Sequence, residues 1–303
     1  MTARLDAFPA ALKRRISDRM ADRLGAPNWP ALKGCLCILF TARSGSTPLC
    51  REIERRYGFH RVNGSLNLAQ ITHTMTARGL GSLSEAIGNI VQRESERGWF
   101  AFKTGPQGLI AAETAGFIEA QLKRTRFIFL LRRDLVAQAV SLVKAEQTYI
   151  WHSTQIAERI AEPAVYSGDD ITKAIRNILG ALKSLRRYVD AAGRPCVRLF
   201  YEDFAAGDAT VIEAVCDQLG LPRRRAPRSR DVRTTVKIGD EENLAWVERY
   251  NAEMEGEIAT AVAEYTTSCA AAQADPAAVV ASAGRTTRTA KSHARQVGKR
   301  PAS

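Results

Sequence analysis

Several features common in other classes of protein are missing from this chain of 303 residues. It has no run of eighteen apolar residues, so a membrane-spanning helix is not expected. Its first residues lack the apolar core of a secretory signal. The six cysteines contain no Cys-x-x-Cys pair, and the four histidines do not cluster with them. We therefore expect a cytoplasmic protein with buried, reduced thiols and no metal site.

Negative charge is absent from the C-terminal end of the chain. From Pro276 onward there is no Asp or Glu, while Lys and Arg side chains there contribute half of the formal net charge of +12. This stretch is rich in Ala, Thr, Ser and Arg, and its apolar residues show no helical or strand periodicity after Val280. We therefore expect residues 271–303 to be a disordered basic tail. The basic residues concerned are Arg285, Arg288, Lys291, Arg295, Lys299 and Arg300.

A second basic cluster, Arg223-Arg224-Arg225 with Arg228 and Arg230, follows Leu221-Pro222. It can be a solvated loop, or it can attract an anionic nucleotide, an acidic acceptor or a nucleic acid. The chain shows no helix-turn-helix, zinc or RNA-reading signature. We therefore expect no nucleic-acid partner, and we keep a basic nucleic-acid-binding protein as an alternative.

The most informative segment is the short stretch from Cys35 to Thr47. Residues 35–40 form an apolar run typical of a buried strand, and Leu49 and Ile53 then follow at helical spacing. The loop between them, Ala42-Arg43-Ser44-Gly45-Ser46-Thr47, is not a Walker A motif, because it has no second glycine and no Gly-Lys pair. It can still bind an anion, because backbone N–H groups at a helix start, hydroxyls and an arginine converge there. An ordinary turn with Ser46 or Thr47 as N-cap is the alternative.

Strands and helices alternate through the rest of the chain. We predict strands at 98–102, 126–131 and 197–200, and Asp134 as the N-cap of a helix that begins with Leu135. Such alternation predicts an α/β fold with a P-loop-like, mostly parallel central sheet flanked by helices on both faces. The carboxyl ends of parallel strands share one edge, where ligands bind. Further helices are predicted at 82–95, 171–189, 211–219 and 241–265.

The N-terminal part, residues 1–30, is predicted to be an amphipathic helical segment that precedes an α/β domain at residues 31–270. Leu5, Phe8, Leu12, Ile16 and Met20 fall on one helical face. This face can dock onto the body of the protein or a partner, or it can contact a membrane surface.

The residues after the first and third strands resemble those of sulfotransferases that use 3′-phosphoadenosine 5′-phosphosulfate (PAPS). In that superfamily a basic residue followed by Ser-Gly and two hydroxyl residues holds the 5′-phosphosulfate. The 3′-phosphate is held by an arginine and a serine that are separated by seven residues. Arg43-Ser44-Gly45-Ser46-Thr47 matches the first element, and Arg133 with Ser141 matches the second. The likeness is closest to the bacterial trehalose and nodulation-factor sulfotransferases and extends from about Cys35 to about Tyr250. It is carried also by Phe102-Lys103, by the string from Arg133 to Ser141, by Trp151, and by Tyr201-Glu202-Asp203-Phe204.

One departure from the family concerns the general base. Sugar-modifying members carry a glutamate that would fall near Gly64 or Ser65, but here no carboxylate lies between Glu54 and Glu85. A positioned base accelerates attack by a hydroxyl by about 10²–10⁴-fold. His60 is the nearest titratable substitute, and His73 is a weaker candidate. A different acceptor, a distant carboxylate or weak catalysis are the alternatives.

The resemblance implies a sulfotransferase-type nucleotide-binding fold and transfer of a sulfo group from PAPS, with 3′,5′-ADP as the product and no metal. The acceptor would be a hydroxyl of a carbohydrate, a glycolipid or another small molecule. Arg43 and Lys103 would be catalytic along with His60, while Gln138 and Trp151 would shape the acceptor site. A catalytically impaired nucleotide-binding homologue is a further alternative. The oligomeric state is open, and a homodimer is one of the states considered.

Overall fold

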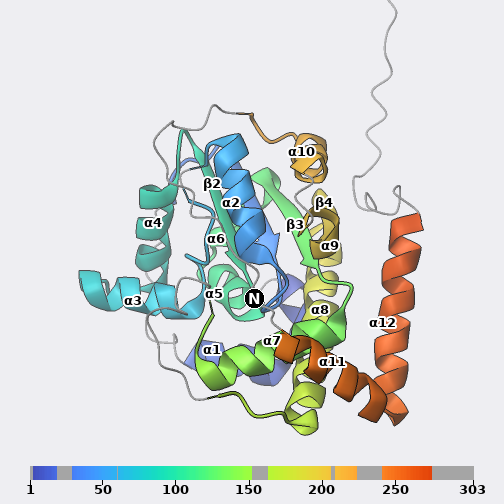
Figure 1. Cartoon of the computed structure of the whole chain (residues 1–303). Coiled ribbons are helices and arrows are strands. Elements are labelled where there is room, and N and C mark those ends of the chain that lie inside the picture. The colour runs from blue at the N-terminus through green and yellow to red at the C-terminus, as the bar shows by residue number, and fades with distance from the viewer. Residues whose placement is uncertain are drawn as a thin grey trace, which may run out of the picture.

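The computed structural model describes residues 3–18, 29–59, 61–151, 163–205, 209–223 and 241–274. Its centre is a four-stranded sheet in the order β2-β1-β3-β4, in which every neighbouring pair is parallel (Figure 1). This confirms the predicted parallel sheet. The strands are β1 (Gly34–Leu39), β2 (Trp99–Thr104), β3 (Thr125–Leu131) and β4 (Cys196–Phe200).

The strand order creates a switch point at the carboxyl edge. The chain leaves β1 towards β2 on one side, returns to β3 on the other side of β1, and continues outward to β4. The loops that follow β1 and β3 therefore diverge to opposite sides and leave a crevice between them, the place where open α/β sheets bind ligands. Arg43 lies in the first of these loops and Arg133 in the second.

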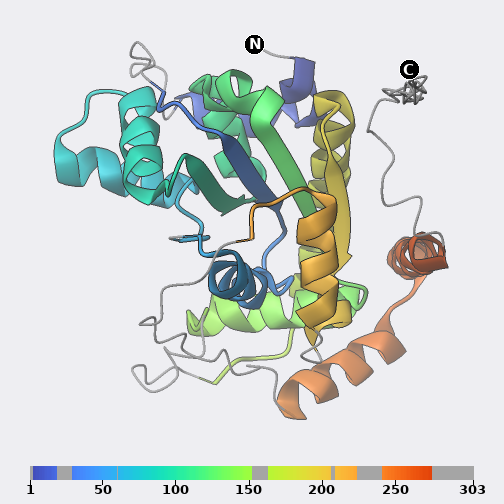
Figure 2. The same cartoon turned by 90° about the horizontal axis from the view of Figure 1, so that it is seen from above.

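Both faces of the sheet are buried, as expected for parallel strands. Leu36 and Ile38 of β1 pack with α2 (Ser46–Tyr57) and α10 (Ala209–Gln218) on one face. Cys35, Cys37 and Leu39 point the other way and belong to the larger core cluster, which includes residues of α5, α7 and α8. Figure 2 shows α2 and α10 together on one side of the sheet. The helices described between the strands also include α3 (Leu68–Arg78), α4 (Leu83–Glu94), α5 (Pro106–Thr114), α6 (Phe117–Gln121), η2 (Leu122–Arg124), α7 (Leu135–Thr148) and α8 (Gly168–Ala192), and α9 (Tyr201–Ala205) follows β4.

The N-terminal segment is not the single helix that its spacing predicts. A 3₁₀ helix, η1 (Ala3–Ala7), and α1 (Ala10–Asp18) are separated by Phe8 and Pro9. Proline lacks the N–H that a continuous helix needs there. Leu5, Phe8 and Ile16 are buried in the main core, so within the described residues this face docks onto the body of the protein.

The C-terminal helix predicted over 241–265 is also divided. The structure has α11 (Glu241–Glu253) and α12 (Gly256–Ala274), joined by Met254 and Glu255. Gly256 has φ +61°, a left-handed conformation that glycine adopts without steric cost and that interrupts a continuous helix. The break lets the two helices run in different directions along the flank of the domain (Figure 1).

Several predictions concern residues outside those described, namely His60, Met20, the basic cluster beyond Arg223 and the tail from Pro276 onward. Among the helices that the structure does describe, none combines the length and the apolarity needed to cross a membrane.

All six cysteines are free thiols, and burial raises the pKa of Cys35, Cys50 and Cys216 to about 12. Because the thiolate is the reactive form, we expect the native protein to react slowly with a thiol reagent at pH 8 and rapidly after unfolding in urea. Counting labelled thiols by mass spectrometry tests this. Complete labelling of the native protein within the mixing time would show that these strands and helices are not packed as described.

Candidate anion-binding site at the carboxyl edge of the sheet

The loop after β1 has a backbone that few residues can adopt. Arg43 has φ +63° and Gly45 has φ +82°, both in the left-handed region. Gly45 is the N-cap residue of α2, and no side chain caps this helix, so neither Ser46 nor Thr47 is the cap. The ring of Tyr201 lies against Gly45, and a Cβ there would be 2.1 Å from Cδ2 of Tyr201. Gly45 is therefore required both by its conformation and by this close contact.

We predict that Gly45→Ala disrupts the loop. The added methyl group would displace the Tyr201 ring and would be strained at a positive φ, where a non-glycine residue destabilises by about 1–3 kcal/mol. The affinity for an anionic nucleotide should fall by about tenfold or more, as measured by calorimetry. Gly79→Ala is the control, since Gly79 also has a positive φ but a Cβ there would meet nothing within 4 Å. Equal losses in both variants would contradict a specific role for the Tyr201 contact.

The Arg43 side chain joins three segments that are far apart in the sequence. Its Nε donates to Oγ of Ser141 at 2.8 Å, and its Nη1 donates to the carbonyl of Trp151 at 2.7 Å. Burial, followed by the neighbouring charge of Arg132, lowers the pKa of Arg43. The predicted residues Arg43, Ser141 and Trp151 are thus brought together at one place.

Lys103 lies near the end of β2 and reaches the start of α2. Its Nζ donates to Oγ of Ser46 at 3.1 Å and to Oγ1 of Thr47 at 3.0 Å. The ammonium also lies 5.4 Å from the ring centre of Phe40. The positive end of the α2 dipole and a lysine therefore coincide, an arrangement that favours a bound anion.

Gln138 and Ser44 are almost completely buried beside the same loop. Nε2 of Gln138 donates to Oγ1 of Thr41 at 2.8 Å and to the carbonyl of Ala42 at 2.7 Å, so Gln138 holds the loop against α7. Among the described residues, Oγ of Ser44 has no hydrogen-bond partner. A contact between Gln138 and an acceptor stays a prediction.

Arg133 has a different environment from the one that its spacing to Ser141 suggests. Its Nη2 pairs with Oδ1 of Asp203 at 2.7 Å, and its guanidinium lies 4.3 Å from the ring centre of Phe200. Its backbone N–H points at both carboxylate oxygens of Glu202, each at 3.0 Å. Ser141 is instead the partner of Arg43. A phosphate shared by Arg133 and Ser141 stays a prediction.

The basic side chains at this site face neutral polar groups. Within the described residues, Arg43, Lys103 and Arg132 have polar contacts with hydroxyls and carbonyls and none with a carboxylate. Positive charge that is partly buried and not neutralised is unfavourable unless an anion binds to it. The edge between β2 and β3 is therefore suited to a strongly anionic ligand.

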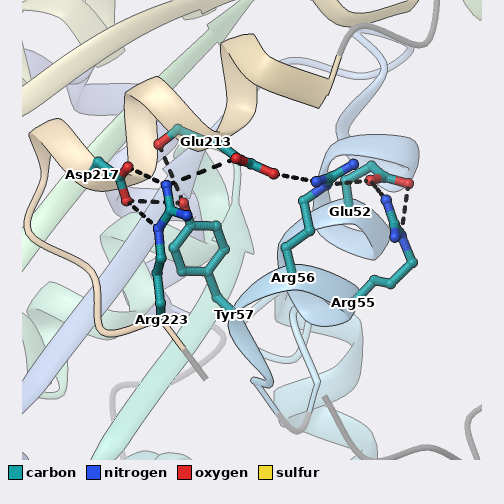
Figure 3. A network of polar contacts seen from close by, with 7 residues as sticks. All are labelled: Glu52, Arg55, Arg56, Tyr57, Glu213, Asp217 and Arg223. Carbon is teal, nitrogen blue, oxygen red and sulfur yellow. Dashed lines mark hydrogen bonds and ion pairs between the residues drawn. The ribbon is translucent and has the colours of Figure 1, made fainter. Parts of the chain in front are cut away.

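A network between α2 and α10 shows the opposite arrangement (Figure 3). Arg223 pairs with Asp217 at 2.5 Å, and this guanidinium lowers the pKa of the Asp217 carboxyl. Arg223, the first arginine of the basic cluster, is thus neutralised by local acidic residues. The network consists of three arginines, three carboxylates and a tyrosine: Arg55, Arg56, Arg223, Glu52, Glu213, Asp217 and Tyr57.

Sequence reasoning missed Arg132, Glu202 and the packing role of Tyr201. The signals were present as two adjacent arginines before an N-cap aspartate and an acidic pair directly after a strand. Asp134 is the N-cap as predicted, with its side chain accepting from N of Ala137 at 2.8 Å. His73 is exposed on α3.

Comparison with known proteins gives a family likeness over part of the chain. Residues 108–253 match the family model of the Stf0 sulphotransferases. This part of the chain is thus similar to sulfotransferases. A segment of 127 residues is 29% identical to trehalose 2-sulfotransferase of Mycobacterium tuberculosis (strain ATCC 35801 / TMC 107 / Erdman), covering 42% of this chain and 46% of that protein. The chain thus matches less than half the length of this relative. The region matched by the family model includes Arg133, Gln138, Ser141 and Trp151 but not the loop after β1.

Two solved structures are similar to this chain, each with 16% sequence identity. The sulfotransferase domain from the Synechococcus PCC 7002 olefin synthase has a TM-score of 0.46 and covers 81% of this chain and 98% of its own. The sulfotransferase from Alicyclobacillus acidocaldarius has a TM-score of 0.40 and covers 77% of this chain and 96% of its own.

Proposed function

We propose that the protein transfers a sulfo group from PAPS to a hydroxyl of a small acceptor and releases 3′,5′-ADP. The observation that carries the proposal is the gathering of Arg43, Lys103 and Arg132 at the crevice without a carboxylate partner among the described residues. PAPS has a phosphosulfate and a second phosphate, and a site with this charge matches both. The match of residues 108–253 to the Stf0 sulphotransferase family model supports this donor.

The loop after β1 would hold the 5′-phosphosulfate. The backbone N–H groups at the start of α2 and the hydroxyls of Ser44, Ser46 and Thr47 are its donors. Lys103, which bonds to two of these hydroxyls, would stabilise the charge that develops on the oxygen between phosphorus and sulfur. Gly45 lets the Tyr201 ring pack directly against this loop and so supports its conformation.

Arg133 and Ser141 would bind the 3′-phosphate, as the family resemblance implies. A guanidinium has five N–H donors, so the pairing of Arg133 with Asp203 leaves others for a phosphate. The Ser141 hydroxyl accepts from Arg43 and keeps its own proton for donation. Both groups can therefore serve the nucleotide without losing their described contacts.

In the reaction the acceptor oxygen attacks sulfur in line and forms the new O–S bond. The S–O bond to the 5′-phosphate breaks, and its electron pair leaves with 3′,5′-ADP. The acceptor proton passes to a base, for which His60 is our candidate. Trp151, which is 36% exposed and has its carbonyl bonded to Arg43, is our candidate for contact with the acceptor.

A carbohydrate, a glycolipid or another small hydroxyl compound is the proposed acceptor class. The relative from Mycobacterium is named for transfer to trehalose, so trehalose is the first compound to test. Incubation with PAPS and a panel of sugars and glycolipids should give 3′,5′-ADP at a rate that depends on one acceptor. Tight binding of 3′,5′-ADP without turnover on any acceptor would favour the catalytically impaired homologue instead.

A further inference from the structure

Arg132 follows β3 directly and is directed at the loop after β1. Its Nη1 donates to the carbonyl of Arg43 at 3.2 Å. The centre of its guanidinium lies 5.4 Å from the ring centre of Tyr201, the same ring that packs against Gly45. Arg132 is therefore held beside the backbone that would bind the phosphosulfate.

The backbone of Arg132 is also fixed from both sides. Its carbonyl accepts from Oη of Tyr265 in α12 at 2.9 Å. The next residue, Arg133, donates its backbone N–H to Glu202. These contacts hold the turn after β3 rigidly, so its side chains are positioned in advance of binding.

The guanidinium of Arg132 retains unused donors. Its Nε is buried and has no hydrogen-bond partner among the described residues. No described carboxylate pairs with it, whereas the adjacent Arg133 pairs with Asp203. A buried N–H without a partner is unfavourable, and an anionic oxygen would satisfy it.

We propose that Arg132, to which the family resemblance assigns no role, is a second arginine that binds an anionic group of the nucleotide at this site. The inference rests on the proposed function and extends it. An arginine held over an aromatic ring, with its Nε unpartnered among the described residues, is suited to a phosphate or sulfate oxygen. Arg133 would serve the 3′-phosphate, and Arg132 would add charge beside the loop after β1.

The test is calorimetric titration of 3′,5′-ADP into the wild-type protein, Arg132→Ala, Arg132→Lys and Arg124→Ala. Arg124 is the matched control because it is exposed and immediately precedes β3, at the opposite edge of the sheet. Arg132→Ala should weaken binding by about tenfold or more, as loss of a hydrogen bond between charged groups implies. Arg132→Lys should recover part of the affinity, and Arg124→Ala should bind like the wild type.

Parallel titrations of 5′-AMP and 3′-AMP identify the phosphate concerned. If Arg132→Ala lowers the affinity only for ligands that carry a 5′-phosphate, Arg132 faces the phosphosulfate. A loss only with ligands that carry a 3′-phosphate also supports the proposal and places Arg132 with Arg133. Equal affinity in Arg132→Ala and Arg124→Ala, with melting temperatures unchanged, would overturn the inference but leave the proposed function intact. Absence of binding in the wild type would overturn both.

Discussion

Lys103→Met should lower the turnover number by about 10²–10³-fold, the loss expected when one preorganised donor to a developing oxyanion is removed. Methionine is unbranched like the lysine stem but has no ammonium, so the change removes the charge together with its contact with the Phe40 ring. Lys103 donates to the hydroxyls of Ser46 and Thr47 and so lies at the start of α2. Steady-state rates of 3′,5′-ADP release measure the effect.

Lys123→Met is the matched control for this change. Lys123 is exposed in η2, before β3 and thus at the amino edge of the sheet. The Lys123→Met variant should retain the wild-type rate, because Lys123 and the proposed site lie at opposite ends of the strands. A Lys103→Met rate within threefold of the wild type would remove Lys103 from the chemistry and restrict it to holding the two hydroxyls.

His60→Ala should lower turnover by about 10²–10⁴-fold while leaving the affinity for 3′,5′-ADP unchanged, if His60 is the base. The segment around it lacks a carboxylate from Arg55 to Ser84. The described part of this segment runs beside β2, since the carbonyl of Asn63 accepts from N of Lys103 at 2.8 Å. A base on this segment would therefore be near Lys103.

His73→Ala is the control for the histidine prediction, because His73 is exposed on α3. The pH dependence provides a second readout. A base must be unprotonated, so kcat of the wild type should rise with pH through the ordinary histidine range and level off above it. Normal turnover in His60→Ala would exclude His60 and direct attention to a more distant carboxylate, with Glu54 the first to test.

The central sheet and the anion-binding loop could be predicted because they depend on local pattern. All four strands are five to seven residues long and largely apolar, and polar residues lie in or shortly after the last positions of each. Such runs are typical of strands buried on both faces. The breaks at Pro9 and Gly256 were also visible as residue types. Continuous helices are nevertheless predicted there, because the helical spacing of apolar residues continues across each break.

The partners of the arginines could not be predicted, because they depend on contacts between distant segments. Arg43 bonds to Ser141 across 98 residues, and Arg133 pairs with Asp203 in α9, which follows β4. The spacing of Arg133 and Ser141 suggested that they share one ligand, but spacing does not show which neutral or acidic groups pack around each. Two adjacent arginines in one turn face different neighbours, and only the fold distinguishes them.

The PAPS site is tested by titration calorimetry of 3′,5′-ADP with the wild-type protein, with ATP and 5′-AMP as controls at low and moderate salt. We predict tight binding that requires the 3′-phosphate and persists at moderate salt, because the site provides directed hydrogen bonds as well as charge. Binding that is no tighter than that of ATP, or that disappears at moderate salt, would contradict a PAPS site. It would then favour a basic surface that attracts polyanions such as nucleic acid.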